Sequence, residues 1–196
     1  MKKLLFISCI VCALLLHSCS KESENNSEVE ISNNAIMIED DTYVSIKGLE
    51  EVFDFKENHS ASQINFTDGE FYYVQVVIFG NLQPIWRARD ASLWVYADLF
   101  APGFEGLTSG TYDFKPDNTD ENDIDLSNSH FFIDGKVAID LNKDGELESD
   151  DNEFLKITGG SIKLERQEDY YEIELNLSLE NNIQVTGKFS DDFDQV

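Results

Sequence analysis

The most regular pattern in the chain is an alternation of apolar and polar residues near its C-terminus. Every second residue from 171 to 179 is apolar, and the residues between them are polar. A period of two predicts a β-strand with one buried face, whereas a helix would scatter these residues around its axis. The turn residues 180–182 and a second alternation over 183–189 predict a hairpin. A similar alternation at 162–165 extends it to a three-stranded meander.

Two runs further upstream, 71–79 and 93–100, are aromatic and β-branched on both faces. This pattern predicts strands that are covered on each side, with a polar connection between them at residues 87–90. About nine to eleven short strands separated by turn residues predict an all-β domain, an antiparallel β-sandwich or barrel. The shorter strand candidates lie at 42–47, 51–56, 61–66, 110–114, 130–133 and 136–140.

Charge narrows the classes of function. The chain of 196 residues has 39 acidic against 14 basic residues and a net charge of -25. Such a charge repels phosphate backbones and anionic headgroups, which argues against nucleic-acid binding and against adsorption to membranes through a basic patch. Hydrophobic residues make up 41% and aromatic residues 12% of the chain, more than a disordered chain usually carries. We therefore expect one folded domain with its own core.

The first nineteen residues form a separate segment. Lys2 and Lys3 precede an apolar stretch over residues 4–16, and the small residue Ser18 stands before Cys19. This order predicts a signal peptide over residues 1–18 that is removed on export. The apolar stretch is too short to span a bilayer. All three cysteines of the chain lie within this segment, so the mature domain has no internal disulfide.

Residues 16–19, Leu-His-Ser-Cys, resemble the lipobox of bacterial lipoproteins, although His17 departs from the small or β-branched residue that is usual there. The resemblance implies that Cys19 is acylated, with palmitate among the expected lipids, and anchors the protein to a membrane. An ordinary secretory peptide that contains a cysteine is the alternative. Residues 19–35, rich in Ser, Asn and Glu, are expected to be a flexible tether, and residues 36–196 the β domain.

Three short segments resemble those of lipoproteins from Bacteroidota. Residues 20–24 are similar to the acidic export signal that directs some of these proteins to the outer face of the outer membrane. Residues 107–112 and 186–189 are similar to small β-rich lipoproteins of the same group. The resemblance implies a place in the outer membrane, with the cell surface as one location, and implies no activity.

Residues 140–151 carry the candidate metal site. Oxygen-bearing side chains stand at the first, third, fifth, ninth and twelfth places, with glycine at the sixth and an aliphatic residue at the eighth. This spacing resembles the EF-hand loop, and more closely the loop of dockerin repeats, and implies calcium as the cofactor. Zinc lacks ligands, because the mature domain has two separated histidines and no thiol. The expected ligands are Asp140, Asn142, Asp144, the backbone carbonyl of Glu146, Glu148 directly or through water, and Asp151.

Two features depart from those families. The segment before the loop is predicted to be a strand and not a helix, and the motif occurs once, whereas dockerins carry it twice. Cohesin binding is therefore not inferred. We expect a dissociation constant of about 0.1 to 1 mM, as in extracellular calcium modules. The alternative is an acidic hairpin turn, because Asp-Gly is a common turn pair.

Sequence motifs of catalysis are missing. The chain has no Gly-x-Ser-x-Gly elbow, phosphate loop, dinucleotide fingerprint or His-Glu-x-x-His motif.

Trp86 beside Arg87 and Arg89 is a candidate binding surface, since binding surfaces favour exposed aromatic and arginine residues. Three hypotheses follow: a non-enzymatic, calcium-stabilised envelope lipoprotein, a module that binds a glycan, another nutrient or an envelope protein, and a carboxylate-based hydrolase. The first hypothesis is favoured because it requires the fewest assumptions.

Overall fold

The structure is a computed structural model. It describes residues 33–56, 59–78, 81–116, 119, 124–147 and 153–195. The predicted signal peptide, Cys19 and most of the predicted tether lie outside these residues. The chain divides into two compact units, 1–30 and 31–196, and all described residues belong to the second. No described helix is long and apolar enough to cross a membrane.

The described residues form β-strands, one short 3-10 turn at Glu180–Asn182, and no α-helix. The predicted all-β class is therefore confirmed. The strands are β1 (Ala35–Ile38), β2 (Asp41–Val44), β3 (Lys47–Lys56), β4 (His59–Thr67), β5 (Glu70–Ile78), β6 (Asn81–Arg89), β7 (Leu93–Pro102), β8 (Gly110–Phe114), β9 (Phe131–Ile139), β10 (Glu146–Leu147), β11 (Phe154–Gln167), β12 (Tyr170–Leu179), β13 (Gln184–Asp192) and β14 (Asp194–Gln195).

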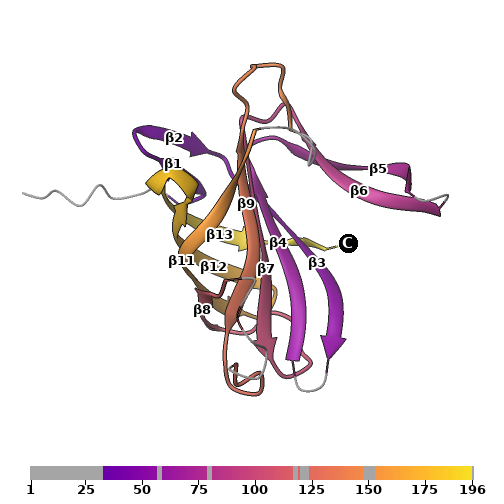
Figure 1. Ribbon diagram of the computed structural model, residues 1–196, viewed down its shortest axis with the longest axis vertical. Helices are drawn as coiled ribbons and strands as arrows, with labels where there is room; N and C mark the ends of the chain where they lie inside the picture. Colours follow the sequence, from indigo (N-terminus) through magenta and orange to yellow (C-terminus); the bar gives the residue numbers. More distant parts are fainter. Residues whose placement is uncertain are drawn as a thin grey trace, which may run out of the picture. The chain divides into compact units, whose positions relative to one another are not determined.

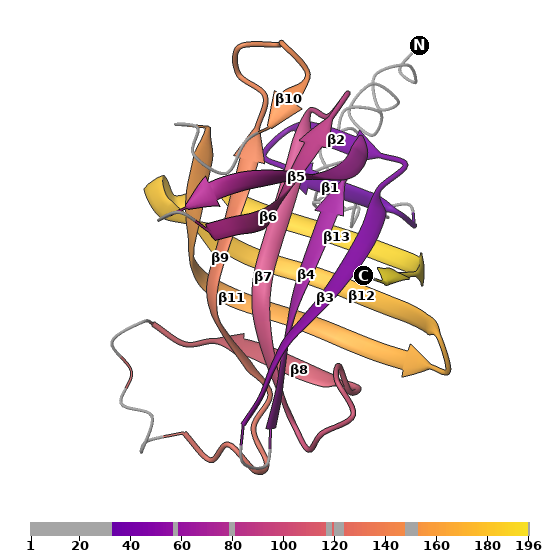
Figure 2. The same cartoon turned by 90° about the vertical axis from the view of Figure 1, so that its right-hand side faces the viewer.

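One large sheet contains eleven of these strands, in the order β14-β3-β4-β7-β9-β8-β11-β12-β13-β1-β2, with a direct pairing of β9 and β11 as well. The pairings are antiparallel except for β8 with β9 and β14 with β3. The sheet curls on itself: β14, which follows β13 along the chain, pairs with β3 near the other end of the order. In Figure 2, β3, β4, β7 and β9 cross in front of β11, β12 and β13. This arrangement is consistent with the predicted sandwich or barrel.

The inside of the curled sheet holds the main hydrophobic core. Phe66 is fully buried, and its ring lies 5.2 Å from that of Phe189 and 5.9 Å from that of Phe193. The core also buries one carboxylate, Glu50, which accepts hydrogen bonds from the Ser62 and Tyr171 hydroxyls at 3.0 and 3.3 Å. Because both oxygens of Glu50 are paired, this charge is compatible with the apolar core around it.

A second, three-stranded sheet has the order β10-β6-β5. Its β5–β6 hairpin projects from the large sheet, as Figure 1 shows. At the base of the hairpin, a second cluster of buried residues joins the two sheets. Its buried members are Ala88, Ala91, Trp94, Ala138 and Leu147, and Phe71, Trp86, Tyr96 and Phe154 pack against them partly buried.

Several strand predictions need correction. The predicted polar connection at 87–90 is the end of strand β6, and the separate strands predicted at 130–133 and 136–140 are one strand, β9. Strand β5 is not covered on each side, because Tyr73 and Val77 on the projecting hairpin are 61% and 68% exposed. The predicted C-terminal meander is present as β11, β12 and β13, paired in that order.

Candidate metal centre

The predicted calcium loop connects β9 to β11. Its two ends are held together where the Ile139 N–H donates to the Glu153 carbonyl at 3.4 Å, and its first residue is fixed where the Asp140 N–H donates to the Ser92 carbonyl at 3.1 Å. The structure describes the loop as far as Leu147. The predicted ligands Asp140, Asn142, Asp144 and Glu146 are therefore described, whereas Glu148 and Asp151 lie outside the described residues.

The loop backbone winds around the side chain of Asp140. Its Oδ1 accepts the N–H groups of Lys143 at 2.6 Å and Asp144 at 3.3 Å, and its Oδ2 accepts the N–H of Gly145 at 2.9 Å. Three successive backbone donors thus converge on one carboxylate. A carboxylate has about four lone-pair sites, and these three bonds leave one of them, on Oδ2, as acceptor capacity for a cation.

Asn142 and Asp144 continue the same pattern. The Asn142 Oδ1 accepts the Asp144 N–H at 2.8 Å, and the Asp144 Oδ1 accepts the Glu146 N–H at 2.9 Å. Short polar side chains that bond to the backbone two residues ahead are typical of tight turns. The first, third and fifth side chains of the motif are in this way held by the turn that they cap.

Glycine is needed at the sixth place of the loop. Gly145 has a φ of +78°, in the left-handed region that side chains disfavour. Its carbonyl accepts the Ala91 N–H at 3.2 Å, which attaches the turn to the segment that precedes β7. A larger residue at 145 would strain the point at which the loop meets the large sheet.

Glu146 and Leu147 attach the loop to the second sheet. They form β10, which pairs with Arg89 and Ala88 of β6. The Glu146 carboxylate accepts the Tyr72 hydroxyl at 2.9 Å, and burial together with this carboxylate raises the pKa of Tyr72, so that the hydroxyl remains a donor. Leu147 is fully buried in the second cluster. The side chain of Glu146 is therefore occupied, while its carbonyl is the group expected to face a cation.

A further acidic residue that the sequence analysis missed, Glu153, lies at the exit of the loop. It is 9% exposed, and its Oε1 accepts the N–H groups of Leu141 at 3.0 Å and Asn142 at 3.1 Å. Its Oε2 is buried without a hydrogen-bond partner. An unpaired buried carboxylate oxygen is costly, and a bound cation would remove the cost. The residues of the loop therefore fit a hard cation that prefers oxygen ligands.

The described oxygen atoms do not form a complete coordination shell for a metal ion. Among the described residues, no three His, Cys, Asp or Glu side chains lie close enough together to hold a metal ion. Calcium takes six to eight oxygen ligands, and these include groups other than carboxylates, such as the Asn142 amide and the Glu146 backbone carbonyl. The described first half of the loop thus supplies part of a calcium coordination shell. Completing the shell requires side chains from the second half of the loop or from the residues that follow it.

The predicted binding surface of Trp86, Arg87 and Arg89 divides between the two faces of the hairpin. Successive residues of a strand point to opposite faces, so Trp86 faces away from both arginines. Arg89 pairs with Glu70 at 3.0 Å, and its guanidinium lies 5.5 Å from the Tyr72 ring centre. The three side chains therefore do not form one surface, because residues 86–89 are a strand and not a connecting loop.

The Trp86 face of the hairpin is largely apolar, although it also carries the exposed Gln75. Tyr73 pairs with Trp86 across the two strands, and the rings meet edge to face with centres 5.8 Å apart. Towards the tip, Val77 pairs with Leu82, and these side chains are 68% and 65% exposed. Trp86 itself is half-buried against the second cluster. The exposed part of this face is therefore carried by Tyr73, Val77 and Leu82.

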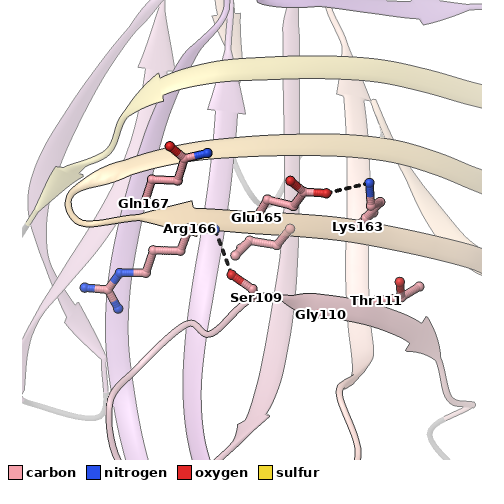
Figure 3. A pocket seen from close by; sticks show the side chains of 8 residues that line it. Ser109, Gly110, Thr111, Lys163, Glu165, Arg166 and Gln167 are labelled. Atoms are coloured by element: carbon pink, nitrogen blue, oxygen red, sulfur yellow. Dashed lines mark hydrogen bonds and ion pairs between the residues drawn. The ribbon is translucent and has the colours of Figure 1, made fainter.

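A groove of about 430 Å³ crosses β8 and β11, with Ser109 at its rim (Figure 3). Its single carboxylate, Glu165, pairs with Lys163 at 2.7 Å, which lowers the pKa of Glu165 and raises that of Lys163. The Arg166 N–H donates to the Ser109 hydroxyl at 2.9 Å. A glycosidase site needs two carboxylates on opposite sides of a bond, and this groove has one. The groove lining is Ser109, Gly110, Thr111, Lys163, Leu164, Glu165, Arg166 and Gln167.

No protein-family model, curated protein or solved structure matches the chain.

Proposed function

We propose that this protein is a non-enzymatic lipoprotein of the outer membrane, anchored through acylated Cys19, with a β domain that calcium stabilises at residues 140–151. The observation that carries the calcium part is the convergence of three backbone N–H groups on Asp140, continued by Asn142 and Asp144. The anchor part rests on the Leu-His-Ser-Cys run at residues 16–19.

The position of the loop explains why a cation would matter to the whole domain. The loop is bonded to the large sheet through Ala91 and Ser92 and to the second sheet through β10 and β6. Asp140, Asp144 and Glu146 bring three negative charges to this junction in a chain of net charge -25. A bound calcium ion would offset their repulsion and rigidify the joint between the two sheets.

Both tryptophans of the chain can report this event. Trp94 is buried in the second cluster together with Leu147 of the loop, and Trp86 packs against the same cluster. We expect calcium to change the tryptophan fluorescence of the full chain in detergent. With about 2 mM calcium and the expected affinity, the free energy of unfolding should rise by about 0.6 to 1.8 kcal/mol. The corresponding rise in thermal midpoint is about 1 to 7 °C.

A matched pair of variants separates the site from general acidity. Asp144→Asn should abolish the calcium response, because it removes the charge of a predicted ligand. Asp125→Asn is the control, since Asp125 is an exposed aspartate that caps a different turn through Ser127 and Asn128. Equal calcium responses in both variants and the wild type, or no response in any protein, would contradict the calcium proposal and leave an acidic turn.

The anchor is tested separately. Replacement Cys19→Ala should prevent incorporation of labelled palmitate and move the protein from the membrane fraction to the soluble fraction, because acyl chains hold the wild type at the bilayer. Membrane association that is unchanged in this variant would reject lipidation at Cys19 and leave the calcium proposal untouched.

The second candidate function is capture of a glycan by the apolar face of the hairpin. The exposed Tyr73 ring, supported edge to face by Trp86, favours it, because such rings offer a flat surface to a sugar. Weak binding of soluble oligosaccharides that is lost in Tyr73→Ala and retained in Tyr170→Ala, a variant at a tyrosine of the large sheet, would support this candidate.

A further inference from the structure

Glu153 stands where the calcium loop re-enters the large sheet. It directly precedes β11, and its carbonyl closes the loop by accepting the Ile139 N–H. Its side chain does not point to solvent, as those of most acidic residues do: the residue is only 9% exposed, and its carboxylate is bonded to the start of the loop. A carboxylate is thus enclosed within the loop base of a very acidic protein.

The two oxygens of this carboxylate have different surroundings. Oε1 accepts two backbone N–H groups, those of Leu141 and Asn142, which follow the first predicted ligand, Asp140. Oε2 is buried and accepts none. A purely structural cap would need one oxygen only, and an amide would serve it equally well. The bare second oxygen is the feature that a structural role leaves unexplained.

We propose that Glu153 closes the calcium shell through Oε2, the role that the twelve-residue spacing gives to Asp151. This inference rests on the calcium site proposed above. In an EF-hand the twelfth residue begins a helix, whereas here the chain continues into strand β11, so the exit of the loop has a different geometry. Glu153 is two places beyond Asp151, has the longer side chain and is held at the start of the loop.

Closure requires a movement of the side chain. Glu153 does not form a metal-holding group with Asp140 and Asp144 in the described structure. Calcium would draw Oε2 towards the two aspartates while Oε1 remains bonded to the loop backbone. The side chain has three rotatable bonds, so the loop backbone can stay in place. The negative charge that burial disfavours would then face the ion.

The experiment compares Glu153→Gln with Asp151→Asn in the full chain in detergent. Glutamine keeps an oxygen for the Leu141 and Asn142 N–H groups and removes the charge. Calorimetric titration with calcium chloride should show affinity weakened at least about tenfold in Glu153→Gln, since even residues that only support a ligand typically contribute about 10- to 100-fold. Asp151→Asn should weaken the affinity by less than about tenfold, the lower bound for a residue that supports a ligand.

A second readout distinguishes coordination from structural capping. In chelator, Glu153→Gln should unfold at or above the wild-type midpoint, because it relieves a buried charge, and should lose the rise that calcium gives to the wild type. If Glu153→Gln does not fold, Glu153→Asp replaces it, with the charge kept and the reach shortened by one methylene. We expect weaker calcium binding in that variant too.

Three results have distinct meanings. Wild-type affinity in Glu153→Gln or Glu153→Asp would overturn the proposal, and so would a loss of binding confined to Asp151→Asn. Failure of the wild type itself to bind at about 10 mM calcium, well above the expected dissociation constant, would reject the calcium site as a whole. The loss of binding in Asp144→Asn, with Glu153→Gln unaffected, would keep the site and remove Glu153 from it.

Discussion

The two hydrophobic clusters of the domain differ in what holds them together. The cluster inside the curled sheet contains large residues from strands throughout the chain, and the buried carboxylate beside it, Glu50, has both oxygens paired. In the cluster below the second sheet, three of the five buried residues are alanines, and the acidic loop supplies Leu147. The first region is stabilised mainly by the burial of large apolar side chains, whereas the second depends on the conformation of a charged loop.

This difference predicts where the proposed calcium ion would act. Removing the ion should leave the interior of the large sheet unchanged, because no residue of the loop up to Leu147 belongs to that cluster. The same removal should weaken the joint that carries the β5–β6 hairpin. Local opening of the large sheet should therefore change little with calcium beyond the modest gain in global stability, whereas the order of the second sheet should follow calcium directly.

The largest effect is expected from a truncation in the first region. Phe66→Ala removes a fully buried ring that packs on Phe189 and Phe193. We expect the free energy of unfolding to fall by about 3 to 5 kcal/mol, with and without calcium. Denaturant titration measures it, and Leu82→Ala, at a residue 65% exposed, is the control with a change of about 0.5 kcal/mol or less. A loss in Phe66→Ala that calcium restored would contradict the separation of the two regions.

The next effect belongs to the second region. Leu147→Ala removes the largest fully buried aliphatic side chain of the small cluster, and we expect a loss of about 2 to 3 kcal/mol. Because Leu147 is part of the loop, calcium affinity should fall with it. In Leu147→Ala, hydrogen exchange should be faster for the backbone amides of β5 and β6 than for those of β12. Leu141→Ala, at a loop residue 73% exposed, should leave exchange and affinity unchanged.

The two regions also differ in how well the sequence predicts them. The meander of β11, β12 and β13 follows from local alternation, because each strand pairs with its neighbour in the chain. Strand β6 was missed: its arginines resembled a polar connection and Pro84 argues against a strand. Proline is accepted there because β10 pairs only with Arg89 and Ala88, at the other end of β6.

The candidate metal site is likewise only partly predictable from the sequence. The spacing of Asp140, Asn142 and Asp144 is a local property, and a twelve-residue pattern finds these residues. Glu153 lies outside that pattern, and its burial depends on how β9 and β11 close the loop. No signal in the sequence separates it from the many exposed acidic residues, because nothing local indicates that one acidic side chain folds inward.

One pH-dependent effect is expected inside the first region. Burial, followed by the charge of Glu50, raises the pKa of Tyr171 to about 12. The folded state therefore favours the neutral phenol. Its contribution to stability is complete below pH 10, the ordinary pKa, and is lost as the pH rises towards 12. We expect a loss of about 1 to 3 kcal/mol over this interval in the wild type.

The matched variants for this effect are Tyr171→Phe and Tyr170→Phe. Tyr171→Phe should be less stable than the wild type at pH 8, because the Glu50 hydrogen bond is missing, and should lose less between pH 10 and 12. Tyr170, 38% exposed on the other face of β12, should keep the wild-type profile when changed to phenylalanine. Identical alkaline profiles in Tyr171→Phe and the wild type would assign the loss to other groups.

The smallest effect concerns the ion pair at the base of the hairpin. Arg89 and Glu70 lie opposite each other on β6 and β5, and both side chains are more than half exposed. A double-mutant cycle with Arg89→Gln and Glu70→Gln should give a coupling of about 0.2 to 1 kcal/mol that falls as salt is added. A coupling above about 2 kcal/mol, outside the range of exposed pairs, would mean that surface charges hold the hairpin. A small one leaves Leu147 and the acidic loop as the elements that attach the second sheet to the first.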